Sequence, residues 1–219
     1  MDDALERLIE LIEGYKADLC GLVHLPETPI EPAGHTVYWN GGKAHIGFSD
    51  IRENTVLIGM ESPILPAHWY ISIPAALAAI GGKKIELKTW GWWLIDEPVH
   101  DAVWITDHVA CYVPNPLTGT NDAKSGKAFL GMKDSYDESH SMKSGIIGNE
   151  GEFIDGIVWH TRQVDSLDEE EMRAAREAGC SVASPNVVPW AIGARAAQCL
   201  FAALIANPEV PAKSLTAGQ

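Results

Sequence analysis

The residues of this chain best suited to proton transfer at neutral pH are its eight histidines. No two of them are spaced as His-x-His or His-x-x-x-His, so the sequence gives little support for a metal site, and we predict neither a metal nor a cofactor. A second group with chemical potential is the turn Trp90-Gly91-Trp92-Trp93, which places three indoles within four residues. These indoles can stack on a flat ligand, enclose a cation or fill the interior. The sequence therefore points to acid–base chemistry or aromatic recognition.

Strands alternating with helices must position these groups. The patterns predict strands at 17–23, 36–39, 44–48, 56–60, 84–89, 153–160 and 180–184. They predict helices at 3–15, 67–80, 166–178 and 190–204. Alternation of this kind indicates a three-layer α/β sandwich around a mixed sheet, and the length suits one domain over residues 1–219.

Local signals refine several of these elements. Asn40-Gly41-Gly42 predicts a hairpin between its flanking strands. Ser166 is expected to cap the third helix, with Glu169 completing a capping box and Gly179 ending the helix. Pro74 is expected to mark either a kink in the second helix or its true start.

Charge and composition exclude several classes of partner. Thirty acidic residues against sixteen basic ones give a formal charge of -14, which repels phosphate backbones and acidic lipid surfaces. We therefore expect neither nucleic-acid nor membrane partners. The N-terminal segment is acidic and amphipathic, unlike a signal peptide, and no apolar run reaches ~20 residues. The scattered cysteines, without a CxxC pair, are expected to be buried and reduced, as in a cytoplasmic protein: Cys20, Cys111, Cys180 and Cys199.

The segment 105–137 carries the most specific pattern in the chain. Its motifs, at fixed spacing, are Asp107-His108, Asn115-Pro116-Leu117, Gly119, Asn121-Asp122, Phe129, Met132, Asp134 and Tyr136-Asp137. In this order they resemble the trimeric purine nucleoside phosphorylases. The resemblance extends more weakly from about His35 to Leu204. It implies the nucleoside phosphorylase fold, here shortened at the C-terminus, and an assembly in which the Phe matched by Phe129 reaches into a neighbouring subunit.

Most active-site motifs of that family are replaced here. The Gly-Ser-Gly phosphate turn is absent after the first strand, and Gly34-His35 alone keeps the form of an anion-site motif. A histidine at a turn before a strand is also often an ordinary surface residue, so both interpretations of His35 stay open. No cation follows the strand at 56–60, where Glu61 would repel phosphate; we interpret Glu61 as a solvated carboxylate in preference to a catalytic group. The purine-reading Glu falls on Leu167, unless Asp168 substitutes for it.

Two further replacements affect the base and sugar pockets. The tryptophan turn stands where the family has small residues, so its indoles either plug the nucleoside pocket or rebuild it as an aromatic surface. The family's Met-Ser pair in the sugar pocket becomes Pro185-Asn186. The family motifs that this chain retains are thus mainly those for fold and assembly, and the motifs that it has lost are mainly those for catalysis.

Three functions remain open at this point. The first is a non-catalytic ligand-binding or partner subunit, in a homotrimer or in a heterotrimer with an active paralogue. The second is a repurposed enzyme of the glycosyltransferase/phosphorylase superfamily that acts on a nucleoside-like or other small aromatic ligand. Its candidate pocket would be lined by His24, His35, Glu61, Trp90, Trp92, His160, Arg162 and Asn186. Phosphorolysis of purine nucleosides, the third, has the least support.

Overall fold

The computed structural model describes residues 3–24, 34–40, 42–48, 54–62, 64–95, 100–111, 113, 116–117, 130–138 and 153–207, without the side chains of residues 24 and 48. The strands in this part of the chain are β1 (Leu19–His24), β2 (Gly34–Trp39), β3 (Gly42–Phe48), β4 (Thr55–Met60), β5 (Lys84–Thr89), β6 (Trp92–Trp93), β7 (Ala102–Val109), β8 (Phe153–His160), β9 (Val182–Ser184) and β10 (Leu200–Ala206). The helices are α1 (Asp3–Glu13), α2 (Trp69–Ala79), α3 (Glu169–Glu177) and α4 (Val187–Ala196). None of these helices is long and apolar enough to cross a membrane.

The described strands form one mixed sheet in the order β2-β3-β4-β1-β5-β10-β7-β8-β9-β6. Strands β4, β1, β5 and β10 run parallel to one another, and so do β7, β8 and β9. The two parallel groups meet where β10 pairs antiparallel with β7. The sequence predictions of an α/β fold and a mixed sheet are confirmed.

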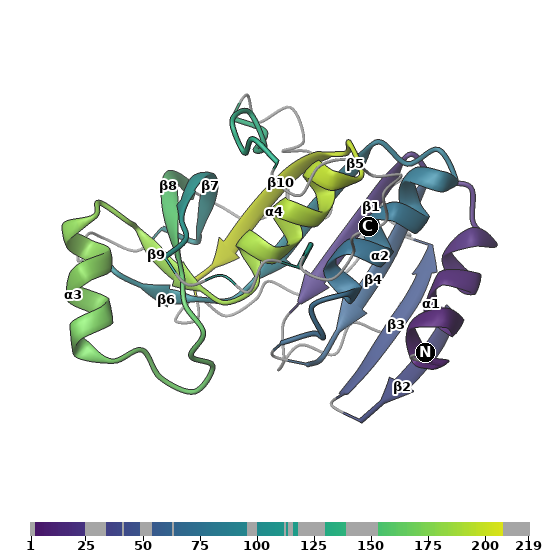
Figure 1. Cartoon of the computed structure of the whole chain (residues 1–219), viewed down its shortest axis with the longest axis horizontal. Coiled ribbons are helices and arrows are strands. Elements are labelled where there is room, and N and C mark those ends of the chain that lie inside the picture. The colour runs from purple at the N-terminus through teal and green to yellow at the C-terminus, as the bar shows by residue number, and fades with distance from the viewer. Residues whose placement is uncertain are drawn as a thin grey trace, which may run out of the picture.

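Helices α1, α2 and α4 lie over one face of the sheet, while α3 lies at the end beyond β9 (Figure 1). Helix α1 buries a single stripe formed by Leu5, Leu8 and Ile12. Helix α2 is apolar on nearly all sides, which suits its position between α1, α4 and the sheet. Pro74 lies inside α2, which begins at Trp69, so of the two alternatives for Pro74 the helix start is wrong.

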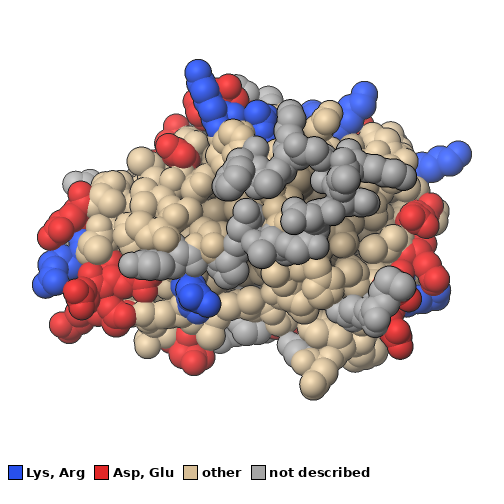
Figure 2. Space-filling view, viewed as in Figure 1, with Lys and Arg blue, Asp and Glu red and all other residues tan. Residues whose placement is uncertain are grey.

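Acidic side chains gather at the two ends of the molecule, over α3 and around α1 (Figure 2). Helix α3 begins with Glu169, Glu170 and Glu171, and α1 carries Asp3 and Glu6 in its first turn. Carboxylates at a helix N-terminus interact favourably with the helix dipole. Part of the charge of -14 thus lies where it supports local structure.

The predicted cap of α3 is wrong in its position. Asp168 caps the helix, because its Oδ1 accepts the Glu171 N–H at 2.8 Å. The backbone N–H of Asp168 donates to Gln163 Oε1 at 3.1 Å, so Gln163 replaces the glutamate of a capping box. The Glu171 side chain instead accepts hydrogen bonds from the Trp159 indole and from Gln163, both at 2.9 Å. The predicted stop at Gly179 matches its left-handed backbone, with φ of 79°.

The helix predicted at 190–204 is also wrong, because α4 ends at Ala196 and β10 begins at Leu200. The turn between them is a Schellman motif, in which Gln198 N–H donates to Arg195 O and Cys199 N–H to Ala194 O. Gln198 occupies the left-handed position with φ of 59°, where glycine is usual. The sequence therefore lacks two signals: α4 has no glycine at its end, and β10 does not alternate polar and apolar residues because it is buried on both faces.

Replacing Gln198 with glycine should raise the free energy of unfolding by up to about 1 kcal/mol, because a side chain at positive φ carries a steric cost that glycine lacks. Urea unfolding of the two proteins measures the difference. The matched control is Ala197→Gly, one residue earlier, where φ is -80°. This control should be neutral or destabilising, and a stabilisation there equal to that at position 198 would contradict the explanation.

Candidate functional site

The end of β5 and the start of α4 meet in a buried polar cluster. Asn186 donates from Nδ2 to Thr89 Oγ1 at 3.3 Å and accepts from the Tyr70 hydroxyl at 3.5 Å. Its backbone N–H donates to Ser184 Oγ at 3.3 Å. All four residues are buried, and burial raises the pKa of the Tyr70 phenol to about 12. Each of these buried polar groups thus has at least one hydrogen-bond partner within the cluster.

The tryptophan turn that follows β5 packs against β9. A Cβ on Gly91 would lie 2.3 Å from Ala183 O, so only glycine permits this approach. Ser184 Oγ donates to Trp90 O at 2.8 Å. The Trp90 and Trp92 rings meet edge to face, with centroids 5.0 Å apart.

The indoles of the turn are divided between two cores. Trp92 packs on the cluster between α3, β8 and β9, and Trp93 packs on the main core beneath α2 and α4. The indole N–H groups of Trp90 and Trp93 are buried without a hydrogen bond to any described residue. These contacts account for much of the aromatic surface of the turn as internal packing.

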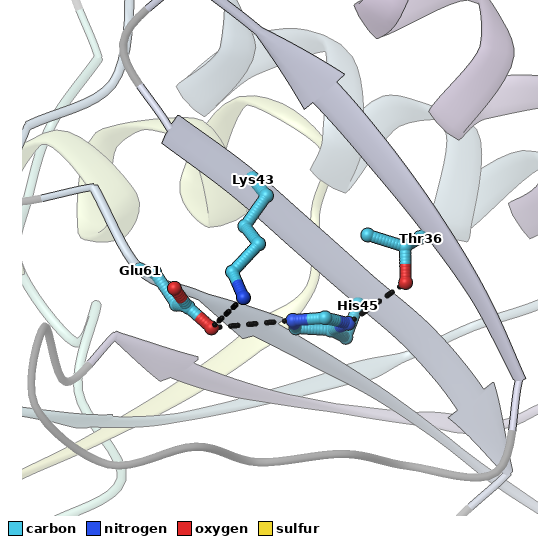
Figure 3. Close-up of polar contacts among 4 residues, drawn as sticks. All are labelled: Thr36, Lys43, His45 and Glu61. Carbon is cyan, nitrogen blue, oxygen red and sulfur yellow. Dashed lines mark hydrogen bonds and ion pairs between the residues drawn. The ribbon is translucent and has the colours of Figure 1, made fainter.

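Glu61 lies just beyond β4 in a network with β2 and β3 (Figure 3). Its Oε1 is 2.9 Å from Lys43 Nζ and 3.2 Å from His45 Nε2. His45 Nδ1 is in turn 3.0 Å from Thr36 Oγ1. The hydrogen bond from Lys43, with a second from His45, lowers the pKa of the Glu61 carboxyl. Glu61 is therefore paired, and the charge of Lys43 already offsets the negative charge that would repel an anion.

Three side chains gather where β7 and β8 end, on the other side of β10 from β5. His108 Nδ1 lies 3.1 Å from the hydroxyl of Tyr136. His160, the last residue of β8, is 4% exposed, and neither ring nitrogen has a hydrogen bond to a described residue. Burial, with repulsion from His108 and Arg162, lowers the pKa of His160 to about 4. Burial also lowers the pKa of His108 and raises that of Tyr136, so all three groups are uncharged at neutral pH.

The structure brings together some of the residues predicted to line a pocket. His160 is paired in register with Ser184, which bonds both Asn186 and Trp90, and Trp92 adjoins Trp90. Arg162 follows two residues after His160 and is exposed.

His35 and Glu61 form part of a separate region on β2 to β4, where the His35 side chain is exposed on the edge strand. The backbone of His24 pairs with Thr89, but its side chain and all of Phe129 lie outside the described residues. Sequence reasoning did not include Tyr70, Thr89, Ser184 and Tyr136 among the site residues. Only Tyr136 carried a signal, as part of the motif 134–137.

Cysteines and metal ligands add little to the site. Cys20, Cys180 and Cys199 are buried free thiols as predicted, whereas Cys111 is exposed, which corrects that part of the prediction. Burial raises the pKa of Cys180 to about 11, so this thiol is unreactive at neutral pH. Among the residues that the structure describes, no three His, Cys, Asp or Glu side chains are grouped to hold a metal ion.

Comparison with known proteins identifies the fold. The sequence matches no protein-family model, and it matches no curated protein. The structure is similar to the purine nucleoside phosphorylase from Schistosoma mansoni in complex with acetate, with a TM-score of 0.68 and 14% identity over 95% of this chain and 90% of that one. It is similar to a schistosoma purine nucleoside phosphorylase in complex with hypoxanthine, with a TM-score of 0.68 and 15% identity over 93% of this chain and 81% of that one. At this identity the likeness establishes the nucleoside phosphorylase fold, which the motifs of segment 105–137 had indicated.

Proposed function

We propose that this protein of the nucleoside phosphorylase fold does not carry out phosphorolysis and instead acts as a ligand-binding or partner subunit. One observation carries the proposal: Tyr70, Thr89 and Ser184 each share a hydrogen bond with Asn186, and all four residues are buried. Phosphorolysis needs an anion and a sugar to be positioned together. Groups that are already bonded to one another at the start of α4 are poorly suited to receive either.

Two further features support the proposal. The turn after β5 packs its glycine on Ala183 and its indoles into two cores, which favours a plug over an open base pocket. Beyond β4, the Glu61 carboxylate is already bound to Lys43, so this lysine is not free to hold phosphate.

The test is release of free base from inosine, guanosine and adenosine, with and without inorganic phosphate. We expect no phosphate-dependent release, because the polar groups beside β5 are engaged with one another. Binding of the same nucleosides is measured in parallel by calorimetry, and it separates a ligand binder from a subunit that needs only partners.

The matched variant for this assay is Asn186→Ala. Phosphate-dependent release by the wild-type protein that this substitution abolishes would overturn the proposal, because the activity would then depend on the buried cluster around Asn186. Release that persists unchanged in the variant would point to a contaminating enzyme.

A repurposed enzyme is the second candidate, and one observation favours it. His160 is a buried, uncharged imidazole without a described partner, beside His108 and Tyr136, which is a suitable environment for a general base. Its pocket would include Trp90, Asn186 and Arg162, and its ligand would be a small aromatic molecule.

The proposal extends to assembly and location. The resemblance of segment 105–137 to the trimeric enzymes supports a homotrimer, or a heterotrimer with a paralogue, in which Phe129 lies at the interface. All the described strands belong to one sheet, with β2 and β6 at its edges, which supports a single domain. Free cysteines support a cytoplasmic location.

A further inference from the structure

The imidazole of His160 is the polar group that the described chain leaves most conspicuously without a partner. His160 is 4% exposed, and both nitrogens of its ring are buried without a hydrogen bond to any described residue. More than nine in ten buried polar groups in folded proteins have a partner, and an unpartnered one costs about 1–3 kcal/mol. A ligand that bonds His160 would remove this cost.

The surroundings of His160 are basic. His108 is paired in register with Val158 on the adjacent strand, so the side chains of His108 and His160 project from the same face of β7 and β8. Arg162 follows two residues later, and both His108 and Arg162 repel a positive charge on His160.

Among the described residues, the charged groups that act on His160 itself are His108 and Arg162, and neither is acidic. Asp107 on β7 acts on His108 and Tyr136, and its Oδ1 accepts the backbone N–H of His108 at 2.7 Å. The thiol of Cys180, before β9, also lies near Asp107 and Cys111, and burial raises its pKa to about 11, so it carries no negative charge at neutral pH. Three basic side chains thus converge in a protein whose net charge is -14.

We propose that His160, His108 and Arg162 form a binding site for a small oxyanion, a phosphate or a carboxylate group. The exposed Arg162 guanidinium can bond such a group in two places, and His160 provides an N–H donor at the floor of the site. The inference specifies a ligand for the ligand-binding role proposed above and rests on that role. The site lies at the ends of β7 and β8, and the pairing of His160 with Ser184 on β9 places it next to the turn after β5.

Binding of an anion at this site should be coupled to protonation of His160. A bound anion favours the imidazolium form, so it should raise the pKa of His160 from about 4 toward its ordinary value of 6.5. The complex should therefore take up a proton as it forms in mildly acidic solution, and affinity should increase as the pH is lowered.

The experiment is calorimetric titration of the wild-type protein with inorganic phosphate and, separately, with acetate, at pH 6 and pH 8. We expect tighter binding at pH 6 and a loss of about tenfold or more in affinity in His160→Gln and in Arg162→Gln, because each removes a charge-assisted hydrogen bond. The controls His68→Gln and Arg173→Gln change exposed residues, one just before α2 and one on α3, and should bind as the wild type does. Whichever anion binds identifies the source of the oxyanion.

A second measurement does not depend on folding of the variants. The ring signals of His160 in the wild-type protein are followed by NMR over pH 4 to 8, with and without phosphate or acetate. An increase in the pKa of His160 with either anion supports the site. No increase, or binding that survives both Gln substitutions, overturns it and leaves ordered water as the partner of His160. The base-release assay is independent of this result, so failure of the anion site would not be mistaken for retained phosphorolysis.

Discussion

Between pH 6.5 and pH 4, the wild-type protein should lose about 3 kcal/mol more of its free energy of unfolding than His160→Gln loses. The cause is the pKa of His160, which is about 4 in the folded chain against 6.5 when exposed. Over this interval the unfolded chain binds a proton that the folded chain does not, so stability falls as the pH is lowered. Urea unfolding at closely spaced pH values measures how the free energy of unfolding of the wild-type protein and of His160→Gln changes with pH.

The comparison between proteins is needed because carboxylates also titrate in this range. The hydrogen bonds that lower the pKa of Glu61 and Asp168 make both proteins less stable in acid, and this contribution is the same in the two. His68→Gln is the matched control, because His68 is exposed. A wild-type slope equal to that of His160→Gln would show that the imidazole is hydrated or already paired with an anion.

Gly193→Ala should lower the free energy of unfolding by more than about 2 kcal/mol. Helix α4 approaches α2 so closely that a Cβ on Gly193 would lie 1.7 Å from Tyr70 O and 3.3 Å from a ring carbon of Pro74. Pro74 has no N–H to donate to the Tyr70 carbonyl four residues earlier, and so opens the helix surface at this point. A methyl group here must push the two helices apart, which would also disturb the Tyr70 and Asn186 side chains.

Chemical unfolding and near-UV circular dichroism measure this effect. The matched control is Gly131→Ala, because a Cβ on Gly131 meets no atom within 4 Å. We expect the control to remain within about 0.5 kcal/mol of the wild type. An equally small effect of Gly193→Ala would mean that α2 and α4 can separate without cost.

The sequence predicted most of the fold because most elements carry local signals. The sequence of β5 alternates polar and apolar residues, and β2 and β3 form a hairpin whose connection contains glycine. Helix α1 has a single apolar stripe. The end of α4 had no such signal, because Gln198 takes a position where glycine is usual. The start of α3 was misplaced because two capping residues, Ser166 and Asp168, lie two positions apart, and the hydrogen bonds of Gln163 favour the second.

The site was less predictable because its contacts join distant segments. Tyr70 meets Asn186 across 116 residues, and Trp90 meets Ser184 across 94. Residue types can suggest that His160 or Asn186 does chemistry, but only the pairing of β8 with β9 brings the two regions together. Glu61 was interpreted as a solvated carboxylate, and its ion pair with Lys43 depends on the register of β3 against β4.

The position of β10 has a consequence for synthesis of the protein. Strand β10 comes last among the described strands, yet it lies in the middle of the sheet and joins β5 to β7. Until Leu200–Ala206 leaves the ribosome, the strands made earlier form two groups that each present an unpaired inner edge. A nascent chain or one truncated before Leu200 therefore exposes two hydrogen-bonding edges at once, which makes premature termination a route to aggregation.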